Sequence, residues 1–426
     1  MKSLFAAVLL AFPLLASAQS ASTAPATGRA LGLAEAYKLA LARSEEIAIS
    51  GENWNETVAK ADELWSHVMP HVNVMGTETF QDVPKGQSGL FLQHQREQGW
   101  VNAHQPLFSG FREFIAFKAA KGLGRAAELK LERAKQLLYQ DVARSWLDLL
   151  EAQEDIRIRA ALLEITNDRV RDLKEFRRLG RARPSEHLAA EAQAAQLVAQ
   201  LESARAAEQV AQFKLGFLTG LDERLAPTEL PVPAAPPALE AALAKARARA
   251  DVEARREEKD AAAAGIKVAS RQRWPSIAVD GNYYFSRPPS FTSDVRWDAT
   301  ITGTLPIWSG GEIGAQTRQA KARAKAGEAA LSQAIRTAEL DARSAHQQLL
   351  SSVSVVAALD AAEKLAEQNA KAQSEDYRLG QVTNLDVLGG LNVLQQTRLS
   401  QNAARVDAYW SRVRLEVAAG VPGGSL

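Results

Sequence analysis

The sequence predicts a mainly α-helical protein that carries a few membrane-type β-strands and is built twice from one structural unit. Three observations predict this class. Motifs recur 200 positions apart, two helical stretches hold roughly 68 residues each, and four short segments alternate between apolar and polar residues. Together they indicate long helices joined to a small set of strands that face both lipid and water.

Residues 1–18 are typical of a secretory signal peptide. A basic start precedes the apolar run from Leu4 to Leu15, and Ala16-Ser17-Ala18 forms a cleavage site. The run is too short to cross a bilayer as a helix, which needs about twenty residues. The mature chain is expected to begin at Gln19, with residues 19–30 as an N-terminal extension. The chain contains no cysteine, so disulfides and an acylated N-terminal cysteine are both excluded.

An internal repeat organises the rest of the chain. The motif QPLFSG at residues 105–110 returns as LPIWSG at 305–310, and RLG at 178–180 returns at 378–380. Both pairs are offset by 200 positions. The predicted segments are repeat 1 at 31–221, a proline-rich linker at 222–238, repeat 2 at 239–421 and a tail at 422–426.

Each repeat is predicted to contain an opening helix, two strands, a very long helix and a returning helix. The long helices would each measure about 100 Å, and the two shorter helices of a repeat sum to roughly that length. Stacked end to end, the shorter helices would run antiparallel beside the long one. The predicted helices are Leu31–Met69, Gly110–Leu179 and Pro184–Leu218 in repeat 1, and Leu239–Arg273, Gly311–Leu379 and Asn384–Ala418 in repeat 2.

Apolar residues on the long helices keep a seven-residue spacing, which predicts left-handed coiled-coil packing. The series in repeat 1 is Val142, Leu149, Ile156, Leu163 and Val170, and repeat 2 continues it at Ala342, Leu349 and Val356. An ordinary soluble coiled coil shows the same periodicity, so the spacing alone leaves both interpretations open.

Four segments are predicted to be strands with one lipid face and one wet face, at about 71–80, 97–107, 276–285 and 296–306. A soluble hairpin explains any one of them equally well, but their recurrence at matching repeat positions favours membrane strands. The aromatic residues Tyr283, Tyr284, Phe285 and Trp297 are expected to contribute to an aromatic girdle. Because the smallest membrane barrels have about eight strands, a chain with four must oligomerise.

The order, spacing and duplication of these motifs resemble the TolC-type outer-membrane efflux protein family, from about Leu31 to Gly420. The resemblance implies a homotrimer in the cell outer membrane, with a 12-stranded barrel made of four strands per protomer. A long α-helical coiled-coil barrel would continue it through the periplasm. The implied function is a passive exit duct of a tripartite efflux or type I secretion system. Its implied partners are outer-membrane lipid, a periplasmic adaptor protein and an inner-membrane pump of RND or ABC type.

The resemblance also implies where the functional residues lie. The pore constriction is expected at Asp386, Glu186 and Tyr377. The adaptor-docking tips are expected at Arg178, Leu179 and Gly180 in repeat 1 and at Arg378, Leu379 and Gly380 in repeat 2. Gly389 stands where some members carry a second aspartate, so a single acidic ring is expected, and Val382 replaces an arginine that those members use to hold the tip closed.

Simpler roles suit several of these residues. Asp386 lies three residues after Thr383, and Glu186 lies two after Pro184, so both are expected to cap helix N-termini. Capping is compatible with a place in the pore. The basic residues Arg177, Arg178, Arg181 and Arg183 suit either a docking surface or a solvated turn.

The composition argues against other functions. The six histidines lack metal-ligand spacing, and the chain has no nucleophile motif, phosphate loop or dinucleotide fingerprint. We therefore expect neither an enzyme nor a cofactor, and the net charge of +1 gives no reason to expect nucleic acid. The alternative function is a periplasmic coiled-coil adaptor (membrane fusion) protein, which the duplicated helix–strand–strand–helix order disfavours. A soluble periplasmic enzyme is a third interpretation, and it lacks a site.

Overall fold

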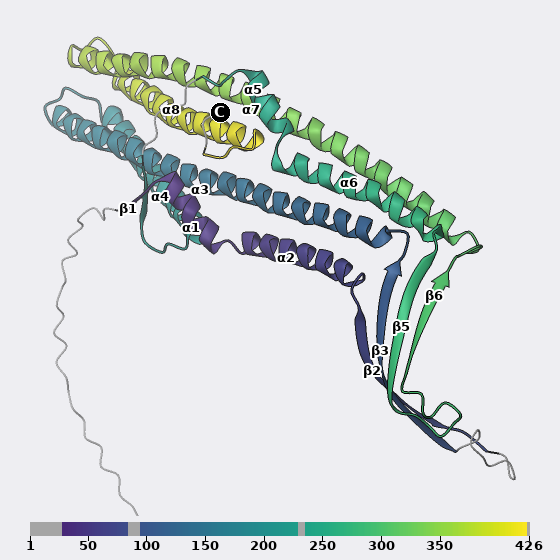
Figure 1. The fold of residues 1–426 in the computed structure, drawn as a ribbon. Helices are drawn as coiled ribbons and strands as arrows, with labels where there is room; N and C mark the ends of the chain where they lie inside the picture. Colours follow the sequence, from purple (N-terminus) through teal and green to yellow (C-terminus); the bar gives the residue numbers. More distant parts are fainter. Residues whose placement is uncertain (1–27, 84–93, 229–234, 424–426) are drawn as a thin grey trace, which may run out of the picture.

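The computed structural model describes residues 28–83, 94–228 and 235–423. The predicted signal peptide, most of the N-terminal extension, part of the linker and the last residues of the tail lie outside this part. Figure 1 shows the helices side by side in an elongated layer, with four strands continuing from one end. None of the helices in the described part combines the length and the apolar character that a membrane crossing requires.

The elements follow the same order in both halves of the chain. Repeat 1 and the linker contain β1 (Arg29–Leu31), α1 (Leu33–Arg43), α2 (Glu45–Ser66), β2 (His71–Phe80), β3 (Gln95–Phe108), α3 (Arg112–Arg178), α4 (Pro184–Thr219) and β4 (Leu225–Pro227). Repeat 2 contains α5 (Leu239–Arg247), α6 (Ala250–Ser270), the 3-10 turn η1 (Arg271–Arg273), β5 (Ser276–Ser286), β6 (Trp297–Thr304), α7 (Glu312–Arg378) and α8 (Asn384–Ala418).

The two long helices, α3 and α7, each hold 67 residues. Along one half of the layer the helices pack in the order α4, α3, α8, α7, and along the other half in the order α2, α3, α6, α7. The heptad residues Val142 and Leu149 on α3, and Ala342, Leu349 and Val356 on α7, are buried between these helices. The helical layer therefore has α4 and α2 at its edge on the repeat 1 side and α7 at its edge on the repeat 2 side.

The prediction of one continuous opening helix in each repeat was wrong. In repeat 1 the helix breaks at Ser44, whose hydroxyl accepts a hydrogen bond from the Ile47 amide (3.3 Å) and so starts α2 as an N-cap. In repeat 2 it breaks at Ala248 and Arg249, and Arg249 takes an extended backbone. The Arg249 side chain is buried and pairs with Asp251 (2.7 Å) and Asp341 (3.1 Å). The Ser44 cap and the ion pairs of Arg249 outweigh the helical periodicity on which the prediction rested.

A parallel pair of short strands, which the sequence did not predict, joins the start of repeat 1 to the linker. Arg29 to Leu31 in β1 pair with Leu225 to Pro227 in β4. Leu31 and Leu225 are both inaccessible to solvent, and they pack in one cluster with Trp146 of α3. The indole Nε1 of Trp146 donates to the carbonyl oxygen of Leu31 at 2.9 Å. The linker therefore contributes to a core at the middle of the helical layer.

The four longer strands form one antiparallel sheet in the order β2-β3-β5-β6. The central pairing of β3 with β5 joins the two repeats, and β2 and β6 are left as open edges. Strand β6 ends at Thr304 rather than near 306, where Pro306 has no backbone N–H to donate. Strand β3 is longer than predicted and runs through Pro106 to Phe108.

The two faces of the sheet differ in polarity. One face carries a cross-strand row in which Asn102 donates to Asn282 (2.9 Å) and Asn282 donates to Asp298 (2.8 Å). The opposite face presents Val74 and Ile301, which are 75% and 73% exposed. Because alternate residues of a strand point to opposite faces, the two faces have the polarity expected of a wet side and a lipid side.

The predicted aromatic girdle divides between these faces. Tyr283 lies directly opposite Trp297 on the apolar face, and both side chains are exposed. Tyr284 packs against Trp100 and beneath the guanidinium of Arg287, on the polar face. Consecutive strand residues cannot share a face, so the inclusion of Tyr284 in one girdle with Tyr283 was wrong.

Candidate functional site

The residues predicted to dock a partner form two equivalent turns at one end of the helical layer. Helices α3 and α4 turn at Gly180, and helices α7 and α8 turn at Gly380 (Figure 1). Both glycines have a left-handed backbone, with φ of 73° and 75°, which other residues adopt only with strain. The preceding residues Leu179 and Leu379 are 58% and 71% exposed. Each turn therefore presents an apolar side chain to solvent.

Asp386 caps the N-terminus of α8, as the sequence predicted. Its Oδ2 accepts hydrogen bonds from the Thr383 amide (2.8 Å) and the Thr383 hydroxyl (2.6 Å). The hydrogen bond from the Thr383 side chain lowers the pKa of Asp386, with a further contribution from the backbone. Because the pKa is depressed, the stabilising effect of this cap is present above about pH 4 and is lost as the pH falls through the folded-state pKa. The exposed carboxylate is ionised at neutral pH.

Glu186 caps α4 in the same way, since its Oε2 accepts from the Arg183 amide at 3.2 Å. The structure also brings Glu186 and Tyr377 together, although they belong to different hairpins. Asn384, at the start of α8, links the hairpins because its side-chain amide donates to the carbonyl oxygen of Glu186 at 3.2 Å. Within the part of the chain that the structure describes, the Asp386 side chain forms hydrogen bonds to Thr383 in its own turn and none to the other hairpin.

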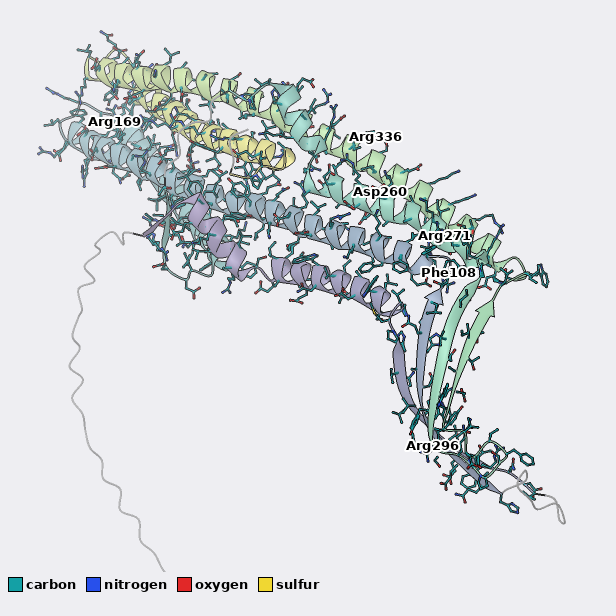
Figure 2. The ribbon with its side chains drawn as sticks, in the orientation of Figure 1. Phe108, Arg169, Asp260, Arg271, Arg296 and Arg336 are labelled. Atoms are coloured by element: carbon teal, nitrogen blue, oxygen red, sulfur yellow. The ribbon has the colours of Figure 1, made fainter. Side chains whose placement is uncertain are left out.

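The contact between the hairpins is completed by Arg169 of α3. Its Nε donates to Oδ1 of Asn384 at 2.9 Å, and its guanidinium lies 3.8 Å from the centre of the Tyr377 ring. Burial raises the pKa of the Tyr377 hydroxyl, and the charge of Glu186 adds to this effect. Burial also lowers the pKa of Arg169. Figure 2 shows Arg169 near the turn end of the layer, far from Phe108 and Arg271 at the strand end.

Sequence reasoning missed Arg169 and Asn384. Each has a different residue at the matching place in the other repeat: Asn369 matches Arg169, and Pro184 matches Asn384. This divergence between otherwise similar repeats was the available signal. It carried no information about which residues meet, because Arg169 and Asn384 are 215 positions apart.

We expect Arg169→Ala to loosen the contact between the two hairpin tips. The change removes a stacked cation and leaves the buried Asn384 amide short of a partner, which together cost about 1–3 kcal/mol. The measurement is the resting conductance of the purified protein in planar bilayers, which should rise. Tyr377→Phe is the matched control, because it keeps the ring under the guanidinium and should conduct like the parent. Unchanged conductance in Arg169→Ala would contradict a closing role for this contact.

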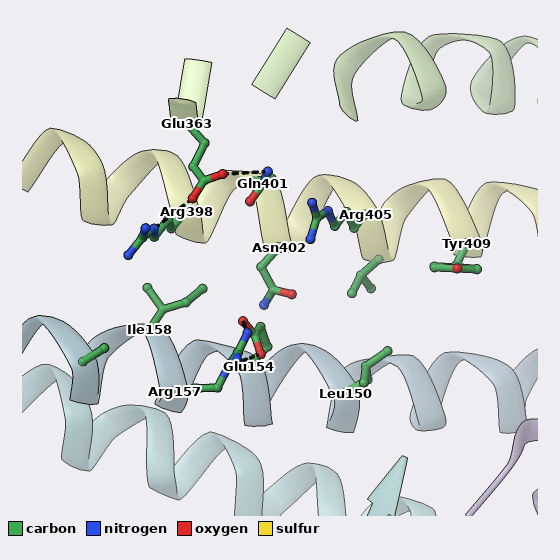
Figure 3. Close-up of a pocket in the computed structure, with 12 residues that line it drawn as sticks. Leu150, Glu154, Arg157, Ile158, Glu363, Arg398, Gln401, Asn402, Arg405 and Tyr409 are labelled. Carbon is green, nitrogen blue, oxygen red and sulfur yellow. Dashed lines mark hydrogen bonds and ion pairs between the residues drawn. The ribbon is translucent and has the colours of Figure 1, made fainter. Parts of the chain in front are cut away.

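Further from the tips, a cleft of about 530 Å³ separates α3 from α8. Figure 3 shows Asn402 pointing from α8 across this cleft toward α3. The Asn402 amide donates to Asp155 (2.8 Å) and to the carbonyl oxygen of Glu151 (3.0 Å). Arg398 on the cleft wall pairs with Glu363 at 3.0 Å. The charged groups in this cleft are therefore engaged in contacts within the chain.

Polar contacts continue along the seam between the hairpins. The amide of Gln193 donates to Asn392 at 2.8 Å, and that of Gln395 donates to Gln200 at 3.3 Å. A small apolar cluster, which includes Leu162, Leu197 and Leu391, packs beneath them. The seam between the hairpins therefore combines side-chain amide hydrogen bonds with a buried apolar cluster.

No group of three or more acidic or histidine side chains in the described part of the chain is arranged to hold a metal ion. The geometry instead defines an elongated protein with two distinct ends. It has a helical layer with a turn end, a polar seam near that end, and a sheet with an exposed apolar face at the other end.

Comparisons with known proteins match part of this chain to a protein family. Residues 239–421 match the family model described as "Outer membrane efflux protein". The resemblance stated from the sequence is confirmed, with repeat 2 as the matched domain, and so is the outer-membrane location.

Solved structures of such proteins share the fold of nearly the whole chain. CusC is 17% identical, with a TM-score of 0.83, and the match covers 91% of this chain and 92% of that one. VceC from Vibrio cholerae is 18% identical (TM-score 0.78; 92% and 97% covered). The MtrE channel of Neisseria gonorrhoeae, solved in its open state, is 20% identical (TM-score 0.76; 91% and 89% covered). No protein of the curated set matches this chain in sequence. MtrE is described as an outer-membrane channel.

Proposed function

We propose that this chain forms a homotrimeric, passive exit duct that docks a periplasmic adaptor and an inner-membrane pump at its hairpin tips. One observation carries the proposal: every layer of the molecule is open at both lateral ends. The sheet ends in the unpaired strands β2 and β6, and the helical layer ends in α4 and α2 on one side and in α7 on the other. A ring of identical chains would pair each end with the opposite end of its neighbour.

The lateral helices support this closure because they expose apolar side chains. On α4 the exposed residues Val210, Phe213 and Phe217 follow a helical spacing, and they are 52%, 66% and 75% exposed. On α7, Leu340 and Leu365 are 63% and 66% exposed. Large apolar side chains in helical register mark a surface that another protein element covers. In the proposed ring, α4 of one chain packs against α7 of the next.

Three chains would supply twelve strands, which is enough to close a barrel around an aqueous pore. The apolar face with Val74 and Ile301 would contact lipid, and the polar row with Asn102 and Asp298 would line the water-filled interior. In this arrangement the three chains place the caps of α8, and with them Asp386, around one axis at the closed end. Glu186 and Tyr377 contribute to the constriction through their contact with Arg169 and Asn384.

We expect the detergent-purified full-length protein to have a mass of about three protomers, because barrel closure needs strands from three chains. Size-exclusion chromatography with light scattering measures the mass after the detergent contribution is subtracted. The protein should also remain in the outer-membrane fraction after a carbonate wash, whereas a periplasmic adaptor would be released. A stable monomer or dimer would overturn the trimeric duct.

A further inference from the structure

The two hairpin tips share one backbone conformation, but their net formal charges have opposite signs. At both tips the amide of the leucine donates to a glutamate carbonyl four residues earlier at 3.1 Å, from Leu179 to Glu175 and from Leu379 to Glu375. The glycines Gly180 and Gly380 both donate to the residue three positions before them at 3.0 Å. A partner that recognised only the backbone and the exposed leucine would bind the two tips alike.

The charges of the tips differ in sign over segments of equal length. Residues 175–186 contain four arginines and two glutamates, so their formal charge is 4 − 2 = +2. Residues 375–386 contain one arginine, one glutamate and two aspartates, so theirs is 1 − 3 = −2.

The positive charge of the repeat 1 tip is not neutralised within the described part of the chain. Arg177, Arg181 and Arg183 are exposed, and none of them forms an ion pair there. Arg178 pairs with Glu175 at 3.0 Å, but this is a surface pair of little strength. Three exposed guanidinium groups therefore lie within four residues of the exposed Leu179 in the sequence and remain available to a partner.

We propose that the repeat 1 tip is the selective docking site for an acidic loop of a periplasmic protein, and that the repeat 2 tip rejects the same loop. The inference rests on the proposed docking function of the tips and adds the chemistry of the partner. The partner segment carries an apolar side chain that packs on Leu179 and carboxylates that pair with Arg177, Arg181 and Arg183. At the other tip the same carboxylates would face Glu375 and Asp376, which form no ion pair in the described part of the chain.

The consequence is a binding stoichiometry. A trimeric ring would present six tips that alternate in sign, so an acidic loop would find one strong site per chain rather than two. Like charges opposed at a contact disfavour the wrong partner, so the sign difference acts as a specificity device. Such binding weakens as salt rises, because exposed charges are screened over about 8 Å at physiological ionic strength.

The test uses the full-length protein in detergent and two fluorescent helical-hairpin peptides that differ only in the loop. One loop places three carboxylates around a leucine, and the other places three lysines there. Fluorescence anisotropy should show that the parent binds the acidic peptide at one site per chain. The double variant Arg177→Gln/Arg181→Gln should bind it about five- to tenfold more weakly. The double variant Arg336→Gln/Arg343→Gln removes the same charge from exposed residues of α7 away from the tips, and it should bind like the parent.

A charge change at the other tip gives the complementary result. The triple variant Glu375→Gln/Asp376→Asn/Gln381→Arg moves the formal charge of that segment from −2 to +1, and it should bind two acidic peptides per chain. The inference would be overturned if the parent bound two acidic peptides per chain or bound none. It would also be overturned if Arg177→Gln/Arg181→Gln bound the acidic peptide as tightly as the parent.

A photocrosslinker placed at Leu179 or at Leu379 in cells separates this inference from the proposed function. Crosslinks of equal strength from both tips would leave tip docking intact and refute the selectivity. The absence of crosslinks from either tip would refute docking itself.

Discussion

Replacing Trp146 with alanine is expected to lower the free energy of unfolding by about 3–5 kcal/mol, the usual cost of deleting a buried tryptophan. The side chain is inaccessible to solvent, and it packs with Leu31, Leu215 and Leu225 in the largest apolar cluster of repeat 1. Its Nε1 also fixes the first strand by donating to the carbonyl oxygen of Leu31. The change would create a cavity where α3, the N-terminal strand and the linker meet.

Thermal melting of the detergent-solubilised protein, followed by circular dichroism, measures this effect as a lower midpoint. Trp146→Phe should lower the melting midpoint by less than Trp146→Ala. Phenylalanine keeps an aromatic ring, so this variant loses only part of the buried volume and one hydrogen bond. Trp308→Ala is the matched control, because that tryptophan is 87% exposed and its removal should leave the midpoint unchanged. Equal midpoints for Trp146→Ala and the control would show that this cluster does not anchor the fold.

The sequence predicted those parts of the fold that depend on local patterns. Glycines with a left-handed backbone end the long helices at Gly180 and Gly380, and both turns were located from the repeated RLG motif. Residues such as Val142 and Leu349 are buried, as the seven-residue spacing predicted. Alternating polarity located the strands because every second residue of a strand faces the same side.

The parts that were not predicted depend on contacts between distant residues. The pairing of β1 with β4 joins segments almost two hundred positions apart, and three residues give too short a pattern to recognise. The break at Arg249 depends on Asp341 of a different helix. The seam contact of Arg169 with Asn384 likewise has no local signature, because each residue alone suits an ordinary helix position.

Exchanging Asp386 for asparagine is expected to weaken the cation preference of the channel and its blockade by trivalent cations. In the proposed trimer three Asp386 carboxylates face one axis. Each carboxylate within about 5 Å of a trivalent ion contributes about 2.5 kcal/mol even at the dielectric constant of water. Losing all three should therefore weaken blockade by at least two orders of magnitude. Currents from planar bilayers, recorded with and without a hexaamminecobalt(III) salt, give the blocking constant.

The asparagine variant separates the effect of the carboxylate charge from the effect of the α8 cap. Its side-chain oxygen can still accept a hydrogen bond from Thr383, whereas alanine would remove the α8 cap as well as the charge. Two opposing effects set the pH dependence: the hydrogen bonds from Thr383 lower the pKa of Asp386, and repulsion among three carboxylates raises it. If the hydrogen bonds dominate, blockade persists until the pH falls below about 4. Blockade in Asp386→Asn equal to that of the parent would show that Asp386 only caps α8 and that the constriction is formed by other residues.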